Sequence, residues 1–474
     1  MTSAVVVGSG PNGLVGAIRL AQAGLDVTVL EAADRPGGGT RTSELTAPGL
    51  LHDDCAAFHP FGVLSEALAP LGLDRYGLAW AWPEIDLAHP LDDGRAGLLS
   101  RTLDVTLDSL GPDGAAWRRI VGRVATDFDT LAADVLRPIL HVPRHPVALT
   151  RFGLRAALPV TWLVRAFADE PARGLFAGVA AHLFGRLDRP MSSSVGLLLS
   201  AAGHRAGWPV AVGGTRAISD ALVALLADLG GTVTTGVRVT ALDELRDATG
   251  RTPDVVLLDT APDAAVRIVG ERMPPRVRRA LTRFRYGPAA FKLDLAIDGD
   301  VPWTNADVRR AGTVHLGGTA AEIAAAETEV VRGRMPQRPY VLVGQQYLAD
   351  TSRSGDGLNP LWAYAHVPHG FTGDATEAIL AQIERFAPGF RERVVAAARR
   401  GPADLAAYNP NYVGGDISAG ANTPLQVVMR PRWALDPYTL GVDGVYLCSS
   451  ATPPGGGVHG LCGLHAAESA LSRL

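Results

Sequence analysis

The stretch AVVVGSGPNGLVGAIRLAQAGLDVTVLE, residues 4–31, decides the fold of the first part of the chain. It begins with an apolar run of strand length, passes through the glycine pattern GSGPNG at 8–13, and continues as an amphipathic helical segment. A second apolar run then ends on Glu31, which lies 18 residues after Gly13. This order of strand, glycine turn, helix, strand and acid predicts a Rossmann-type dinucleotide-binding unit.

Each glycine of the turn has a physical task in such a unit. Gly8 permits the tight turn after the strand, and Gly10 lets the backbone approach a pyrophosphate at the positive end of the helix. Gly13 lets that helix pack closely on the sheet. The carboxylate of Glu31 can accept both hydroxyls of an adenosine ribose, and its charge would repel the 2′-phosphate of NADP.

Composition narrows the class of protein further. A length of 474 residues suggests two or three domains, and a charged fraction of 19% with a net charge of -4 argues against nucleic acid as a partner. Cys55, Cys448 and Cys462 form no CxxC pair, which argues against a disulfide framework or a zinc site. The first strand leaves no room for a signal peptide, and no long uncharged apolar run suggests a membrane span. We therefore expect a soluble, cytoplasmic protein.

A second glycine cluster, AADRPGGGTR at residues 32–41, follows directly on Glu31. A domain that binds only a nicotinamide cofactor has no need of it, whereas flavoproteins use one to bring backbone amides against the FAD pyrophosphate. With GxGxxG and the strand-end acid, this cluster resembles the FAD-dependent amine oxidase and phytoene desaturase superfamily. One departure is Gly39, where that family commonly has arginine. Arg41 is the alternative source of that cation, unless it is an ordinary solvated arginine.

The resemblance covers essentially the whole chain, including AYAHVP at 363–368 and NPNYVGGD at 409–416. It is strongest to a phytoene dehydrogenase-related subset that includes pyridine nucleotide-disulfide oxidoreductase domain-containing protein 2. It implies an α/β fold, with a Rossmann-type FAD-binding domain and a discontinuous α+β substrate domain that carries a helical cap. The implied FAD-binding domain comprises residues 1–75, 201–268 and 430–474, and the substrate-binding domain comprises residues 76–200 and 269–429.

The resemblance also implies the contacts to a non-covalently bound FAD. They come from both glycine clusters, the strand-end acid, two later segments of the nucleotide domain, and the C-terminal segment LCSSATPPGGGVHG at 447–460. The expected contacts are Gly8, Gly10, Pro11, Asn12, Gly13, Glu31, Ala32, Gly38, Gly39, Thr40, Arg41, Val239, Thr260, Ser449, Ser450, Gly457 and Val458.

Four polar side chains are candidate catalytic groups: Lys292, His59, Asp416 and His459. In amine oxidases a lysine on the strand that matches Lys292 holds a water near flavin N5, and the alternative is a strand lysine that meets a carboxylate such as Asp294. For the two histidines, a structural role is the alternative. The run His52-Asp53-Asp54-Cys55 has no spacing typical of a metal site, so we expect no metal.

The substrate is predicted from what the chain lacks. Amine oxidases have Gly-Gly-Cys-Tyr where this chain has Gly414-Gly415-Asp416-Ile417, and a second cage tyrosine aligns with Leu461. The leading hypothesis is therefore a desaturase-like or dehydrogenase-like enzyme, which transfers a hydride from an apolar isoprenoid-, carotenoid- or polyketide-like molecule to FAD. The alternatives are an amine or alcohol oxidase, and a flavoprotein that mainly binds or chaperones a partner.

Three predictions concern segments outside the nucleotide unit. Helical periodicity predicts one amphipathic helix over residues 117–136, and an apolar run predicts a strand over residues 237–242. Residues 147–167 are strongly apolar but carry Arg151, Arg155 and Arg165. Such a segment can cover an apolar cavity, form a homodimer contact or lie on a membrane surface, and the sequence leaves these alternatives open.

Overall fold

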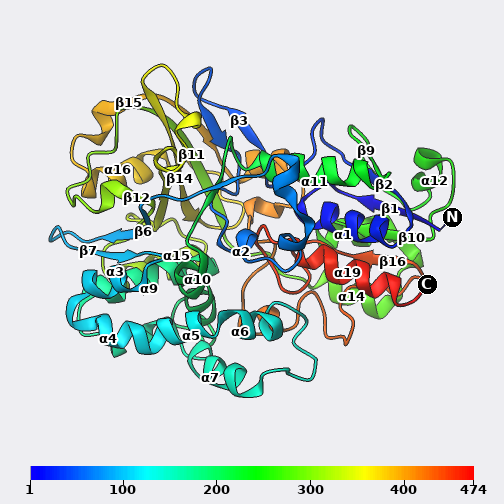
Figure 1. The fold of residues 1–474 in the computed structure, drawn as a ribbon, viewed down its shortest axis with the longest axis horizontal. Helices are drawn as coiled ribbons and strands as arrows, with labels where there is room; N and C mark the ends of the chain where they lie inside the picture. Colours follow the sequence, from blue (N-terminus) through cyan, green and yellow to red (C-terminus); the bar gives the residue numbers. More distant parts are fainter. Residues whose placement is uncertain (1) are drawn as a thin grey trace.

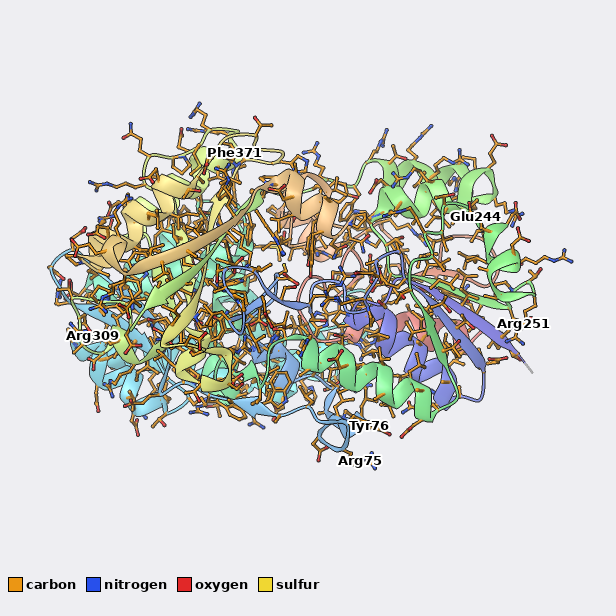
Figure 2. The ribbon with its side chains drawn as sticks, turned by 90° about the horizontal axis from the view of Figure 1, so that it is seen from above. Arg75, Tyr76, Glu244, Arg251, Arg309 and Phe371 are labelled. Atoms are coloured by element: carbon orange, nitrogen blue, oxygen red, sulfur yellow. The ribbon has the colours of Figure 1, made fainter. Side chains whose placement is uncertain are left out.

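Two β-sheets, each with its own helices, divide the computed structural model of residues 2–474 into two lobes (Figure 1). The chain ends lie in the lobe of the five-stranded sheet (Figure 1). In the side-chain view, Glu244 and Arg251 mark the outer end of that lobe, and Arg309 marks the opposite end of the molecule (Figure 2). The α/β class with a Rossmann-type domain is confirmed.

The nucleotide lobe is built on a parallel sheet with strand order β16-β10-β1-β2-β9. Its strands are apolar runs, as expected where helices cover both faces of a parallel sheet. One face packs on α1 (Pro11–Gln22), α11 (Arg216–Asp228) and α19 (Leu461–Leu471), and the other on α12 (Glu244–Thr249), α13 (Pro262–Val269) and α14 (Pro275–Thr282). The strands are β1 (Ser3–Val7), β2 (Asp26–Leu30), β9 (Thr232–Thr234), β10 (Val255–Leu258) and β16 (Val445–Leu447).

The second lobe contains a mixed sheet with strand order β15-β11-β14-β13-β12-β6-β7, in which only the β12–β6 pair is parallel. One face packs on α16 (Thr376–Phe386), and the other contributes to a core shared with α15 (Ala320–Val331). The strands are β6 (Ile85–Pro90), β7 (Ala96–Leu99), β11 (Ala289–Asp298), β12 (Ala311–Leu316), β13 (Val341–Gly344), β14 (Leu358–Val367) and β15 (Val394–Arg400).

The helices that lie between β7 and α11 along the chain form a cap below the second sheet (Figure 1). The predicted single helix over residues 117–136 is wrong in its continuity. A π-helical stretch at Arg118–Gly122 and a break at Asp127 divide it, so that residues three and four apart all reach the core. The cap helices are α3 (Leu103–Ser109), α4 (Gly114–Trp117), α5 (Arg123–Thr126), α6 (Phe128–Val135), α7 (Pro146–Ala156), α8 (Val160–Leu163), α9 (Glu170–Ala180) and α10 (Ser193–Ala206).

The predicted strand over residues 237–242 is also wrong. Its backbone follows the end of β2 without extending the sheet: Val237 N–H donates to Glu31 O at 2.8 Å, and Gly236 N–H donates to Ala33 O at 2.8 Å. This path brings Val239 and Thr240 to the wall of a cavity.

The strands of the two sheets come from different parts of the chain. All strands of the parallel sheet lie within residues 1–75, 201–268 and 430–474, and all strands of the mixed sheet lie within residues 76–200 and 269–429. Among residues 2–474 no single helix is long and apolar enough to cross a membrane. Helix α7 together with residues 160–166 meets that criterion only as a pair bent by 90°.

Candidate active site

A cavity of about 1150 Å³ extends from the glycine turn after β1 into the core under the mixed sheet. It is larger than the roughly 300–1,000 Å³ of ordinary small-molecule sites, so it has room for a dinucleotide and a second molecule. All the expected cofactor contacts line it except Gly13. Gly13 instead packs against the carbonyl oxygen of Gly8, which is the close helix–strand contact expected of it.

The turn has glycine at positions 8 and 10 because a Cβ atom at either position would lie too close to Asp259. Gly8 has a φ of +102°, and a Cβ atom at Gly10 would lie 2.6 Å from Oδ2 of Asp259. On the far side of the turn, Glu31 accepts hydrogen bonds from the backbone N–H of Ser9 (2.9 Å) and from its hydroxyl (2.6 Å). The turn, the N-terminus of α1 and the strand-end acid therefore meet at one end of the cavity, as a dinucleotide requires.

The second glycine cluster packs directly on the first. Gly37 N–H donates to Ser9 O at 3.0 Å, and a Cβ atom at Gly38 would lie 3.0 Å from Cα of Gly10. The hydroxyl of Tyr412 occupies the space that a side chain at Gly39 would need. This contact explains why the chain has glycine where the family commonly has arginine.

Arg41 lines the cavity and belongs to the same loop. Its guanidinium donates to the carbonyl oxygen of Arg35 at 2.9 Å, lies 3.5 Å from Glu31 Oε1, and lies over the ring of Tyr408 at 5.2 Å. Its charge is therefore used within the loop, so it is more than an ordinary solvated arginine.

Two buried polar atoms at this end have no hydrogen-bond partner within residues 2–474: Asn12 Oδ1 and Thr260 Oγ1. Asn12 uses its amide nitrogen to donate to the Ser450 hydroxyl at 3.1 Å, which joins the start of α1 to the C-terminal segment. Because buried polar groups are normally paired, these atoms indicate a polar ligand. Together with the glycine turn and Glu31, the residues fit the FAD that the resemblance implies.

Asp259, which belongs to none of the sequence motifs above, lies behind the turn just after β10. Its Oδ2 accepts from Gly13 N–H at 3.1 Å. Burial, aided by the negative charge of Glu31, raises the pKa of Asp259 to about 7. This carboxyl group therefore titrates near neutral pH, next to the place where a pyrophosphate would bind.

The two candidate histidines both line the cavity, and burial lowers the pKa of each to about 4. His59 Nε2 lies 3.0 Å from the Thr215 hydroxyl, while its buried Nδ1 has no partner within residues 2–474. His459 Nδ1 accepts from Leu461 N–H at 3.1 Å, at the start of α19. Both imidazoles are neutral at ordinary pH, and His459 helps to fix a helix N-terminus.

Lys292 and Asp416 are buried but do not line the cavity. The ammonium of Lys292 meets both carboxylate oxygens of Asp294, and it lies 5.8 Å from the ring of Trp362, which is a cavity residue. Despite burial, this ammonium holds the pKa of Asp294 below its usual range. Of the two alternatives for the lysine, the structure thus places it on a carboxylate; a role toward flavin stays a prediction.

Asp416 orders its own loop. Its carboxylate accepts from the backbone N–H groups of Gly287 (2.6 Å), Ser418 (2.8 Å) and Gly420 (2.9 Å). With these hydrogen bonds, and with its position outside the cavity lining, the side chain is accounted for by the loop rather than by contact with a substrate.

The residues of the His52-Asp53-Asp54 motif diverge to separate partners. Asp53 pairs with the buried Arg353 at 2.6 Å, Asp54 pairs with Arg400 at 2.8 Å, and His52 Nδ1 lies 3.4 Å from Asp294. Across residues 2–474 no cluster of three or more His, Cys, Asp or Glu side chains is arranged to hold a metal. The motif thus ties the first lobe to the strands of the second.

The other end of the cavity is apolar and rich in aromatic side chains. One polar group there is His182, whose Nε2 lies 3.1 Å from Nε2 of the fully buried His315. Burial lowers the pKa of His182 to about 3, so its imidazole is a neutral hydrogen-bonding group at the wall. No spacing pattern along the chain indicates this pair of histidines. The apolar end is lined by Phe58, Leu149, Phe152, Ala156, Phe184, Val195, Leu198, Leu199, Trp208, Leu342, Trp362, Tyr364 and Ile417.

Comparisons with known proteins agree with this geometry. Residues 6–68 match the model of the NAD(P)-binding Rossmann-like domain. Mouse pyridine nucleotide-disulfide oxidoreductase domain-containing protein 2 is 25% identical over 98% of this chain and 92% of its own length. A hydroxyneurosporene desaturase of Cereibacter sphaeroides is 63% identical over 38 residues, which are 8% of each chain.

The fold itself matches that of putrescine oxidase, with a TM-score of 0.63 at 18% identity over 100% of this chain and 98% of that one. The chain is thus similar over nearly its whole length to the mouse protein and to putrescine oxidase, and its resemblance to the FAD-dependent amine oxidase and desaturase superfamily extends from the motifs to the fold. Tyr408 and Tyr412, whose rings stack 6.4 Å apart, line the cavity. Aromatic side chains are therefore present near the glycine clusters, although not at the positions aligned with the amine oxidase cage.

Proposed function

We propose that the chain binds FAD non-covalently and oxidises a C–H bond of an apolar small molecule, in the manner of a desaturase. The observation that carries this proposal is the continuity of the cavity: the dinucleotide end and the aromatic, apolar end form one space of about 1150 Å³. FAD, when bound, supplies a hydride acceptor, and the protein supplies orientation and a dry site.

The residues divide this work along the cavity. The N-terminus of α1 and the glycine turn would hold the pyrophosphate, and Glu31 would hold the ribose. The aromatic wall would orient an apolar chain and exclude water. Loss of a hydride followed by formation of a double bond also releases a proton, and burial, which lowers the pKa of the His182 imidazole at the wall to about 3, makes that group a weak acceptor for it.

Three features support non-covalent binding. Asp416 aligns with the flavin-linked cysteine of the amine oxidase Gly-Gly-Cys-Tyr element, and it has no thiol and does not line the cavity. Cys55 is the one cysteine that lines the cavity among residues 2–474, and burial raises the pKa of its thiol. A thiol with a raised pKa is a poor nucleophile.

Purification and anaerobic titration test the proposal. We expect the protein to carry a flavin absorbance, and acid precipitation to release all of it into the supernatant as FAD. We expect an apolar polyene to bleach the flavin band under anaerobic conditions, and amines and alcohols to leave it unchanged. Bleaching by amines alone would instead favour an amine oxidase, an alternative that the stacked tyrosines and the fold of putrescine oxidase support.

A further inference from the structure

Three lysine or arginine side chains are buried within residues 2–474, and one of them differs from the others. Lys292 meets Asp294, and Arg353 meets Asp53 and Asp350. Arg430, only 3% exposed, has no carboxylate within ion-pair distance in the same part of the chain. An unpaired buried cation costs several kcal/mol, so such a group is expected to have an anionic partner.

Arg430 is held by neutral oxygen atoms. Its Nη2 donates to Asn422 Oδ1 at 2.6 Å, its Nη1 donates to Ser450 O at 3.3 Å, and its Nε donates to Gln426 O at 3.4 Å. These bonds occupy three of the five N–H groups of a guanidinium. The side chain lines the cavity, so donors remain for a ligand in that space.

The neighbours of Arg430 place it where the two ends of the cavity meet. Ser450 accepts from Asn12 at the start of α1, which is the dinucleotide end. Asn422 donates to the carbonyl oxygen of Leu183 at 2.7 Å, next to His182 of the apolar end. A Cβ atom at Gly455 would lie 2.8 Å from Nη1, so the C-terminal glycine turn leaves room for the guanidinium.

We infer that Arg430 is the cation that stabilises the negative charge gained by the bound flavin when it is reduced. This inference rests on the proposed function, because a dinucleotide whose phosphates lie at α1 must present its reactive ring at the junction with the substrate. A hydride brings two electrons and one proton, so the ring gains one negative charge. The unpaired guanidinium at that junction can balance this charge, whereas the charge of Lys292 is already balanced by Asp294.

Sulfite tests this charge without any knowledge of the substrate. Its sulfur lone pair forms a bond to N5 of the oxidised flavin, both electrons come from sulfite, and the ring becomes negatively charged. We expect Arg430→Gln, purified with FAD, to bind sulfite about tenfold more weakly than the wild type. For a two-electron couple, this corresponds to a midpoint potential lower by about 30 mV. Arg430→Lys, which keeps the charge, should retain most of the sulfite affinity.

Arg432→Gln is the matched control, because Arg432 belongs to the same segment, donates to carbonyl oxygens and does not line the cavity. It should leave sulfite binding and the flavin potential unchanged. If Arg430→Gln fails to fold, Arg430→Lys decides: weak sulfite binding despite the retained charge overturns the inference.

Two other ligands give different results and also overturn it. If Arg430 served the pyrophosphate, Arg430→Gln would weaken FAD binding, but the flavin still bound would keep its potential and sulfite affinity. If Arg430 bound a substrate carboxylate, Arg430→Gln would leave FAD binding, the flavin potential and the sulfite affinity unchanged. A wild-type protein that binds no FAD would instead contradict the proposed function, so the two failures are distinguishable.

Discussion

Asp259 is the residue that we expect to make dinucleotide binding sensitive to pH. Its carboxyl group lies at Gly10 and Gly13, behind the N-terminus of α1, and its pKa is raised to about 7. Below that pH it is neutral and can tolerate a pyrophosphate nearby. Above it, the carboxylate adds a second negative charge beside Glu31 and opposes an incoming anion.

We therefore predict that the affinity for FAD falls as the pH rises through about 7, and that Asp259→Asn removes this dependence. At pH 8 the variant should bind FAD roughly tenfold more tightly than the wild type, because one repulsive charge is absent. Fluorescence titration of the apoprotein at pH 6 and pH 8 measures both effects. Asp254→Asn, at the other end of β10, is the control and should keep the wild-type profile. An Asp259→Asn profile parallel to the wild type would refute the prediction.

Among single residues, those with a local task were predictable from the sequence and those with a distant partner were not. Gly8, Gly10 and Glu31 act within one continuous motif, so their spacing was informative. Gly39 is explained only by Tyr412, and Arg430 only by having no carboxylate within ion-pair distance among residues 2–474. Such facts depend on how the chain folds back on itself, and no local pattern carries them.

At the scale of elements, strand β11 carries a buried ion pair on one face. Lys292 and Asp294 are two residues apart, so both side chains point the same way, and both are at most 3% exposed. Removing one partner of a buried pair leaves a charge without compensation. The penalty is larger than the net value of the pair itself.

We predict that Lys292→Met lowers the free energy of unfolding by about 3–5 kcal/mol, and that the double variant Lys292→Met/Asp294→Leu recovers much of this loss. Urea unfolding of the wild type, both single variants and the double variant gives the coupling free energy directly. Strictly additive effects of the two substitutions would show that the pair is not coupled. Arg205→Gln breaks an exposed ion pair with Asp129 and should cost at most about 1 kcal/mol, which makes it a suitable control.

Elements were predictable where hydrophobic periodicity alone decides them. The strands of the nucleotide sheet and helix α16 follow their apolar patterns closely. The errors arose where tertiary contacts override the pattern. The pattern of residues 237–242 favours a strand, yet the N–H group of Val237 donates to the carbonyl oxygen of Glu31, just after β2, and no strand forms. The helix over residues 117–136 is interrupted by a π-helical stretch at Arg118–Gly122.

At the scale of the whole molecule, the cap combines two surfaces in one segment. The inner side of residues 136–166 lines the cavity through Leu149, Phe152 and Ala156. Its outer side exposes apolar side chains, among them Leu154 (71% exposed) and Trp162 (61%). The segment contains five arginines and no acidic residue. Of the three alternatives left open by the sequence, the cavity cover is what the structure places there, and the exposed side is free to meet a further surface.

We predict that this outer side binds anionic lipid, because exposed apolar side chains beside arginines suit a negatively charged membrane surface. In co-sedimentation, vesicles that contain phosphatidylserine should retain the protein, and pure phosphatidylcholine vesicles should retain much less. Arg151→Gln/Arg165→Gln should weaken binding to the anionic vesicles roughly tenfold or more, at about 1 kcal/mol per arginine. Leu154→Ser/Trp162→Ser should weaken it as well.

The control is Val395→Ser, which replaces an exposed apolar side chain on β15, because Figure 1 places that strand on the opposite side of the molecule from α7. If Leu154→Ser/Trp162→Ser instead converts a dimer into a monomer in sedimentation velocity, with no vesicle binding by the wild type, the outer side is a subunit contact and the prediction fails.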